Sequence, residues 1–396
     1  MDNKDVIQYR IDEIKDELVA LSKAIHDKPE LIFKEYSAAE NICRVLSNHG
    51  FKVKKNIAGL ETAFIAEYDC GEPGPTLAFL AEYDALPEIG HGCGHNLIAT
   101  MAVGAALGLK KVSKSLKGKI QVIGTPGEEG GGGKVIMCKE GVFDQVDFAL
   151  MLHPSTHNMI CRGGLATRGV FIEYFGKSAH SSSPESGINA LQAVIQTFNG
   201  IDAMRPLMPL KSNVNGIIKD GGKADNIIPD YSSCEFSVRA DTVGELKSVV
   251  ERIERVVDSV NTLIGTTSKI TKSLVYAERY VNYTIDEKLK ENMENLGEVM
   301  LYPDPKMKYG SSDIGNVSIV VPAIHSYIKI AEKDVNSHSI DFTHAAITDL
   351  AHEQMVKGAK GMAMTALDIL SSKELQEEIT KEFEEKVPKY EKDELD

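Results

Sequence analysis

Thiol and imidazole side chains that suit a metal ion lie together in one short glycine-rich stretch, His91-Gly-Cys93-Gly-His95-Asn96. Cys93 and His95 are separated only by glycine, and Gly92 precedes them, so the backbone can bend both side chains toward one point. A thiolate and an imidazole together suit zinc or a neighbouring first-row metal. By itself the stretch fits equally well a polar turn with a buried cysteine and an exposed histidine.

A pair of adjacent acids, Glu128-Glu129, follows Pro126-Gly127 and precedes four glycines. Taken alone, the pair fits two exposed loop acids. Beside a Cys/His loop it has a chemical use, because one carboxylate can bind metal while its neighbour takes a proton from metal-bound water. The glycines do not indicate a phosphate cradle, since Glu128 stands where such a loop needs glycine and two carboxylates repel phosphate.

Two further histidines are candidate ligands. His153 stands before Pro154 at the end of an apolar run, and His338 lies in the polar loop Asn336-Ser-His-Ser339. A histidine that caps a strand and a surface histidine are the alternatives. The complete set of candidate donors is Cys93, His95, Glu129, His153 and His338. Five donors are more than one tetrahedral zinc ion uses and are enough for two metal ions that share a ligand.

These side chains need a scaffold that gathers distant loops, and the hydrophobic pattern predicts one. Three apolar runs each deliver candidate ligands just beyond their ends, where open α/β sheets collect functional groups. Asp84 follows the run at 76–83, Glu128 follows the run at 119–125, and His153 follows the run at 148–152. We expect the strand at 76–83 to be joined by a turn to an earlier strand at 62–68.

The remaining pattern predicts helices and an inserted domain. Helices are expected at 6–25, 37–48, 97–112, from about 134, 286–300 and 342–370, with strand-like runs at 317–321 and 326–330. The charged segment from 373 is expected to be a solvated or frayed helical tail. From about 168 the order becomes strand, helix, strand, strand, helix, strand, at 169–176, 186–204, 213–219, 231–240, 243–263 and 268–276. This βαββαβ order is ferredoxin-like. The fold class is therefore α/β, with an inserted ferredoxin-like domain.

Composition narrows the class of partner and the compartment. A chain of 396 residues is long enough for two domains. The net charge of −14 argues against nucleic acid or an anionic membrane as the main partner. No apolar run reaches the ~20 residues of a membrane span, and no secretory signal opens the chain, so we expect a cytoplasmic protein. Six scattered cysteines do not form a disulfide framework.

Several stretches together resemble the metallopeptidase superfamily of aminoacylase, acetylornithine deacetylase and succinyl-diaminopimelate desuccinylase, in the branch of hippurate hydrolase and p-aminobenzoyl-glutamate hydrolase. The matching stretches run through nearly the whole chain: Ile25-His-Asp-Lys-Pro-Glu-Leu31, Asp84-Ala-Leu-Pro87, Cys93-Gly-His95, Gly127-Glu-Glu129, His153-Pro154, Gly176-Lys-Ser-Ala-His180, Asn226-Ile-Ile-Pro229 and His338. The resemblance implies a mixed-sheet dinuclear-metallopeptidase catalytic domain in two parts, 1–166 and 279–396, and an inserted lid and dimerisation domain at 167–278.

The resemblance also implies roles for individual residues. Two divalent ions, zinc or manganese with cobalt or nickel possible, would be bound by Cys93, His95, Glu129, His153 and His338. Glu128 would be the general base, and Asp84 would orient a ligand. His180 would reach the partner subunit's site and stabilise the oxyanion, while Asn226 and Arg239 would hold the substrate carboxylate. A homodimer formed through the inserted domain is implied as well.

The expected activity is hydrolysis of the amide bond of an N-acyl, N-aminoacyl or N-aminobenzoyl amino acid by a metal-bound water. Asn96 after His95, and Ser312-Asp313 in place of a Glu-Asp pair, depart from hippurate hydrolases and look more like p-aminobenzoyl-glutamate hydrolase and dipeptidases acting on β-alanyl-lysine-type dipeptides. The alternatives are a broader metallopeptidase that cuts short peptides and a metal-dependent binding protein without turnover.

Overall fold

The computed structural model describes residues 2–390 and 395, which divide into two compact units. The first unit comprises Met1–Gly163 and Arg279–Lys389, and the second is built mainly from Gly164–Glu278. Tyr390 is grouped with the second unit, where its hydroxyl hydrogen-bonds the carboxylate of Glu278. No helix in the described part of the chain has the length and apolar character needed to cross a lipid bilayer.

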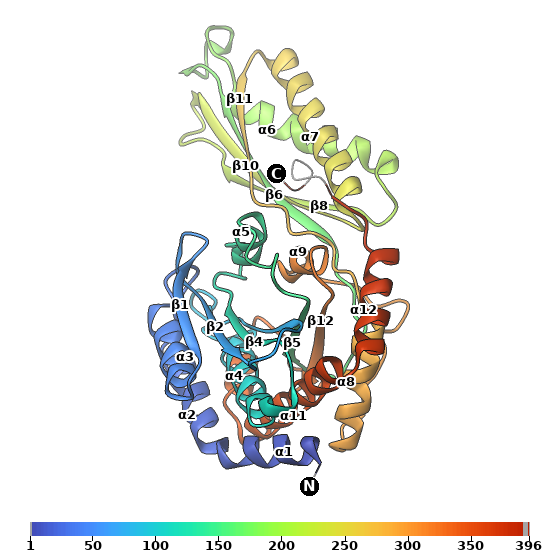
Figure 1. The fold of residues 1–396 in the computed structure, drawn as a ribbon. Helices are drawn as coiled ribbons and strands as arrows, with labels where there is room; N and C mark the ends of the chain where they lie inside the picture. Colours follow the sequence, from blue (N-terminus) through green and yellow to red (C-terminus); the bar gives the residue numbers. More distant parts are fainter. Residues whose placement is uncertain (1, 391–394, 396) are drawn as a thin grey trace. The chain divides into compact units, whose positions relative to one another are not determined.

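A six-stranded mixed sheet forms the centre of the first unit, in the order β1-β2-β4-β3-β5-β12 (Figure 1). The strands are β1 (Lys52–Ile57), β2 (Leu60–Asp69), β3 (Thr76–Ala81), β4 (Lys119–Gly124), β5 (Phe148–Ser155) and β12 (Ala323–Lys329). The last four are parallel to one another, whereas β2 runs antiparallel to β4 and to β1. The carboxyl ends of β3, β4, β5 and β12 therefore share one edge.

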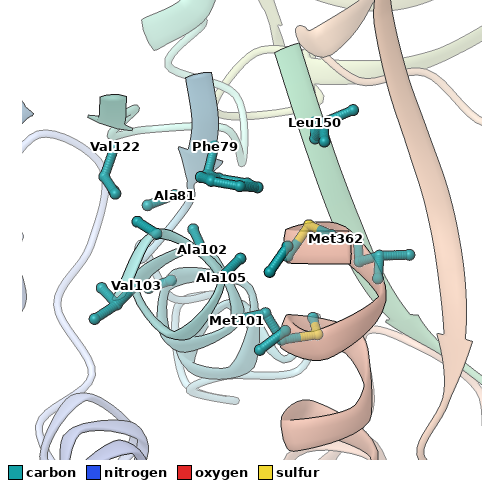
Figure 2. Packing of buried hydrophobic residues seen from close by; sticks show 14 of the residues in the cluster. Phe79, Ala81, Met101, Ala102, Val103, Ala105, Val122, Leu150 and Met362 are labelled. Carbon is teal, nitrogen blue, oxygen red and sulfur yellow. The ribbon is translucent and has the colours of Figure 1, made fainter. Parts of the chain in front are cut away.

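Helices cover both faces of this sheet because its central strands are apolar on both sides. The helices are α1 (Asn3–Glu13), α2 (Lys15–His26), α3 (Tyr36–Asn48), α4 (His95–Lys110), α5 (Gly133–Lys139), α8 (Tyr283–Asn295), α9 (Ile314–Ser318), α10 (Ile340–Ala345), α11 (Asp349–Ser371) and α12 (Lys373–Lys386). Phe79 and Leu150 face α4 and α11, where they pack against Met101 and Met362 (Figure 2). Alternate residues such as Leu80 pack on the opposite side with α5 and α9.

The second unit is an antiparallel four-stranded sheet of order β11-β6-β10-β8 with two helices packed against it. In chain order its elements are β6 (Ala166–Phe175), β7 (Ala179–His180), α6 (Ala190–Met204), β8 (Asn213–Asp220), β9 (Ile227–Ile228), β10 (Tyr231–Ala240), α7 (Val243–Ile264) and β11 (Thr267–Lys272). β7 and β9 form a separate two-stranded ribbon. The expected βαββαβ order is present, and the predicted α/β fold class is confirmed.

Several expected elements differ in the structure. The helix expected at 6–25 is broken at Ile14, where Asp16 and Glu17 favour a new helix start. The run at 317–321 is not a strand, because α9 occupies Ile314–Ser318 and turns Ile314 and Val317 toward the sheet. A short apolar run fits either element, and here tertiary packing decides between them.

The remaining differences concern pairing and helix ends. β2 and β3 are consecutive strands joined by a short connection at 70–75, as expected, but they do not pair with each other, because β4 lies between them in the sheet. The edge strand β1 was missed, since its lysines hide the alternation expected of a strand. The helix expected at 342–370 is two helices, with Thr348 capping α11. The charged segment from Lys373 is helical, but α12 packs against the unit and is neither solvated all round nor frayed, because its Ile379 is fully buried.

Candidate metal centre

The carboxyl edge of the parallel strands gathers the candidate residues of the first unit. Asp84 lies just beyond β3, Glu128 and Glu129 lie just beyond β4, and His153 lies near the end of β5. The loop that carries Cys93 leads into α4, whose first residue is His95. Each strand thus holds one segment of the site at the same edge of the sheet.

The first group of donors is Cys93, His95 and His153, whose ligand atoms lie within 4.8 Å of one another. Gly94 between the first two adopts a left-handed conformation (φ 72°), and a Cβ there would lie 2.9 Å from Cγ of Pro154. Only glycine allows the loop to approach β5 so closely. The ring of His153 hydrogen-bonds through Nδ1 to the carbonyl of Pro154 at 2.6 Å, which leaves Nε2 for a metal.

The second group is Cys93, Glu129 and His338, again with ligand atoms within 4.8 Å of one another. Nε2 of His338 lies 3.7 Å from Oε1 of Glu129. The backbone of His338 is left-handed (φ 61°), and its N–H donates to the carbonyl of Gly92 at 2.9 Å. This hydrogen bond ties the His338 loop to the Cys93 loop. Cys93 belongs to both groups, so it could serve as a ligand in either of them.

A third group, His95, Glu128 and Glu129, places a further carboxylate beside the donors, again with ligand atoms within 4.8 Å of one another. Burial raises the pKa of Glu128 well above its ordinary value, and the negative charges of Glu82, Asp313 and Glu129 raise it further. Cations bound at the two donor groups would lower that pKa again, because positive charge favours the carboxylate. Glu128 is thus a carboxylate whose proton affinity depends on what the donor groups bind.

Asp84 orients two of the donors. Nδ1 of His95 donates to the Asp84 carbonyl at 2.9 Å and lies 3.2 Å from its carboxylate Oδ1, while Oδ2 accepts the backbone N–H of Glu129 at 2.9 Å. Burial opposes charge on the His95 ring, yet Asp84, Cys93 and Glu82 together raise the pKa of His95 well above its ordinary value. The pocket therefore stabilises positive charge at His95 Nε2, whether a proton or a metal supplies it.

Unpartnered atoms show that the donors fit a metal. Nε2 of His95 and Oε1 of Glu129 are buried, and neither has a hydrogen-bond partner within the described part of the chain. A buried polar atom without a partner is costly, and a bound cation removes that cost. Burial lowers the pKa of His153 to about 4, so this ring is neutral and ready to bind. Sulfur, imidazole and carboxylate donors together suit zinc, cobalt, nickel or manganese.

A buried ion network beside the donors was not anticipated from the sequence. Nζ of Lys134 lies 2.6 Å from Oε1 of Glu82 and 2.7 Å from Oδ1 of Asp313, and the backbone N–H of Lys134 donates to Oδ2 of Asp313 at 2.9 Å. All three side chains are at most 1% exposed. The other carboxylate oxygen of Glu82 lies 3.5 Å from Nε2 of His95. The position of Glu82, two residues before Asp84, was a sequence signal that Glu82 lies near the site. No feature of the sequence indicates that Glu82 forms an ion pair with Lys134.

A cluster of rings beside His153 was also missed. The ring of His325 lies 5.3 Å from that of His153, and the ring of Tyr327 lies 5.7 Å from it. The guanidinium of Arg279 donates to Nδ1 of His325 and, at 3.1 Å, to the hydroxyl of Tyr327. His325 was expected to have no role, yet β12 carries it and Tyr327 beside β5. Strand pairing decides this placement, and residue spacing does not reveal it.

The second unit carries the other three predicted residues. His180 is exposed on β7, with its Nδ1 2.8 Å from the hydroxyl of Ser182. The carbonyl of Asn226, the residue before β9, accepts the N–H of Ser181 at 3.0 Å, so Asn226 lies at the end of the β7–β9 ribbon that carries His180. Arg239 lies on β10, opposite Thr167 of β6. Within this unit the structure therefore groups His180 with Asn226 and places Arg239 on the larger sheet.

Comparison with known proteins assigns the family. Residues 167–262 match the family model described as "Peptidase dimerisation domain". The chain is 38% identical to an Xaa-Arg dipeptidase of Mus musculus, over 94% of this chain and 90% of that protein. This chain belongs to the M20 family of peptidases and amidohydrolases. The predicted family is thereby confirmed, as is the prediction of an enzyme that hydrolyses amide or peptide bonds.

Other M20 members agree with this assignment. A p-aminobenzoyl-glutamate hydrolase chain of Escherichia coli K12 is 30% identical, over 70% of this chain and 62% of that protein. The solved structure of a dinuclear metal-binding M20 peptidase from Bacillus subtilis superposes with a TM-score of 0.70 at 21% identity, covering 91% of this chain and 99% of that one. The hydrolase relatives place the chain among amidohydrolases and dipeptidases, and the superposition shows that the fold is shared.

Proposed function

We propose that this M20 enzyme is a dinuclear-metal dipeptidase that also accepts N-acyl amino acids, with dipeptides ending in a basic residue as its first candidate substrates. One observation carries the chemistry: two donor groups share Cys93, and Glu128 lies beside them. The substrate class is supported by the extent of similarity to Xaa-Arg dipeptidases, which covers nearly the whole chain.

The ions, zinc or manganese, would be held by Cys93, His95 and His153 on one side and by Cys93, Glu129 and His338 on the other. When bound, they supply positive charge that polarises the amide carbonyl and makes water a better nucleophile. Asp84 fixes His95 and Glu129 in their binding orientations through the hydrogen bonds described above.

Proton transfer falls to Glu128. Its carboxylate takes the proton from the attacking water and then delivers it to the nitrogen of the leaving amino acid. The high proton affinity that burial and neighbouring acids give Glu128 suits donation of the proton, and positive charge bound at the donor groups would favour the carboxylate that accepts it. Because Glu128 must both accept and donate a proton within one turnover, it needs a pKa between the high value that burial favours and the low value that bound positive charge favours.

The second unit would complete the site in a homodimer. The match to a peptidase dimerisation domain supports assembly through this unit. We assign His180 to stabilise the developing oxyanion in the partner's site, and Asn226 and Arg239 to hold a substrate carboxylate. We also place the enzyme in the cytoplasm, because all six cysteines are free and a reducing compartment keeps them so.

The deciding experiment measures metal content and turnover together. Purified protein loaded with zinc, manganese or cobalt is assayed on alanyl-arginine, β-alanyl-lysine, p-aminobenzoyl-glutamate, hippurate and N-acetyl-cysteine. We expect about two ions per chain and metal-dependent release of a free amino acid. Turnover of longer peptides as well would indicate the broader peptidase, whereas bound metal without turnover would indicate a binding protein.

The proton-transfer assignment is tested by Glu128→Gln. This variant should keep both ions and lose roughly 10²–10⁴-fold in kcat, because the amide cannot accept the proton. Glu140→Gln, which changes an exposed acid at the end of α5, is the matched control and should behave as the wild type. Near-normal kcat in Glu128→Gln would refute the assignment.

A further inference from the structure

The segment 25–35 supplies no residue to the three donor groups of the described chain, yet it is tied to the glycine-rich donor loop. His91, at the start of that loop, donates through Nε2 to the carbonyl of Ile25 at 3.1 Å. The backbone N–H of Ala85 donates to the carbonyl of Glu30 at 2.9 Å. These two hydrogen bonds fix both ends of the connection between β3 and the donor loop to this earlier segment.

The ring of Phe33, in the same segment, lies between two glycines that flank the Glu128–Glu129 pair. A Cβ at Gly127 would lie 2.7 Å from Cε1 of Phe33, and a Cβ at Gly131 would lie 2.9 Å from its Cε2. Cε1 and Cε2 are on opposite sides of the ring, so one aromatic side chain contacts the backbone before and after the two acids. Only glycine at both positions permits so close an approach.

Phe33 is itself held in a conformation that phenylalanine rarely adopts. Its φ is 59°, in the left-handed region. Its backbone N–H donates to Oε1 of Glu35 at 2.8 Å, and the hydroxyl of Thr62 on β2 donates to Oε2 of the same carboxylate at 2.7 Å. Glu35 is fully buried. A buried, hydrogen-bonded carboxylate thus holds a strained backbone, and strain of this kind persists where the surroundings fix one geometry.

The loop that carries the two acids needs such external contacts, because glycine-rich backbone has many accessible conformations. Asp84 fixes the loop at one point, through the backbone N–H of Glu129. The ring of Phe33 contacts it at two further points, Gly127 and Gly131. The position of both carboxylates therefore depends on a side chain that carries no polar group.

We propose that Phe33 is a positioning residue for the Glu128–Glu129 pair: its ring holds the loop so that Glu128 meets the attacking water and Glu129 meets the metal. The inference rests on the proposed function, because the tasks of the two acids are assigned there. Phe33 can neither transfer a proton nor bind a metal ion, so it acts only through the geometry of the loop. Misplacement of a catalytic group by about 1 Å can lower a rate by about 10²-fold.

Phe33→Gly separates positioning from folding. Glycine adopts a left-handed φ without strain, so the variant loses the ring but keeps the backbone conformation, and its urea-unfolding midpoint should stay close to that of the wild type. On alanyl-arginine, with both ions loaded, kcat should fall by about 10- to 100-fold while KM changes by less than about 3-fold.

Two further variants complete the kinetic test. Phe33→Leu should restore part of kcat, because its side chain fills part of the space between the glycines. Phe383→Ala is the matched control and should leave kcat unchanged. Phe383 is also half-buried in the first unit, but it lies on α12, where it lines a small crevice with Tyr280 and Ala323.

Amide hydrogen exchange on the metal-free protein tests the loop directly, without turnover. The N–H of Glu129 donates to Asp84, and that of Gly130 donates to the carbonyl of Glu128 at 2.7 Å. In Phe33→Gly both amides should exchange about 10-fold faster than in the wild type, because the loop opens more often. In Phe383→Ala their exchange should not change.

Three outcomes would overturn the proposal: wild-type kcat in Phe33→Gly, an equal loss of kcat in Phe383→Ala, or unchanged exchange of the Glu129 amide in Phe33→Gly. Should Phe33→Gly not fold, the same comparison is made with Phe33→Leu, whose kcat must then fall below that of Phe383→Ala. Failure of the proposed function is a different result, namely no amide hydrolysis by the wild type. In that case the exchange measurement alone decides whether Phe33 holds the loop.

Discussion

Two sets of charged side chains border the metal centre, and the fold treats them in opposite ways. Glu82, Lys134 and Asp313 are almost completely buried, and every charge has a partner within 2.7 Å. Arg162 and Lys333 line an open cavity beside His153 and have no acidic partner in the described chain. Paired buried charges hold a structure in one arrangement, whereas unpaired cations at a cavity are available to a ligand. The paired set therefore positions neighbouring residues, whereas the unpaired set is available to recognise a ligand.

The largest effect is expected from breaking the paired set. Lys134→Met leaves Glu82 and Asp313 as buried carboxylates without their cation, and should lower the free energy of unfolding by about 3–5 kcal/mol. Urea denaturation of the metal-free protein measures this. The double variant Glu82→Gln/Lys134→Met removes one of the stranded charges and should recover part of the loss. Equal stability of Lys134→Met and the wild type would show that the network is not structural.

Next in size is the pH dependence of metal binding. Without metal, His95 retains a proton through neutral pH because Asp84, Cys93 and Glu82 outweigh the cost of its burial, and burial keeps the Cys93 thiol protonated as well. A metal ion must displace these protons, so the affinity of the protein for the metal should rise with pH. The expected slope is at least about one log unit per pH unit, or roughly 100-fold from about pH 6 to about pH 8. Chelator competition measures this. His344→Gln, at an exposed histidine, should keep the slope, and a flat profile in the wild type would contradict the ligand assignment.

The smallest effect sharpens the contrast between the two sets. Arg162→Met should change the free energy of unfolding by no more than about 0.5 kcal/mol, because the lost contact with Tyr327 is offset by removal of an unsatisfied cation. The same urea denaturation that is used for Lys134→Met measures it. A loss comparable to that of Lys134→Met would mean that Arg162 supports the fold rather than a ligand.

Much of the fold was predictable because its elements carry strong local signals. The apolar strands at the centre of the first unit and the βαββαβ order of the second are visible as hydrophobic periodicity. Errors occurred where local signals are weak or ambiguous. The lysine-rich edge strand β1 lacks the alternation of a strand, α9 has the short apolar run of a strand, and the charged α12 has the composition of a solvated or frayed helix. In each case contacts with distant elements decide the conformation.

The donor residues themselves were visible in the sequence because metal chemistry restricts residue type. Thiol, imidazole and paired carboxylates stand out in short loops beyond apolar runs, as Cys93, His95 and Glu128 do. Which donors lie together was not visible, since Cys93 and His338 are brought close to each other only when the last part of the chain folds back beside the first.

The sequence by itself determined the fold class and the kinds of side chain available, because periodicity and residue chemistry are local properties. Only the tertiary structure decided which charges are paired. Lys134 meets Glu82 and Asp313 across three segments, and Arg162 is left without an acid because strand pairing brings Tyr327, not a carboxylate, to its side. Electrostatic pairing depends on distances in space, and no spacing along the chain specifies them.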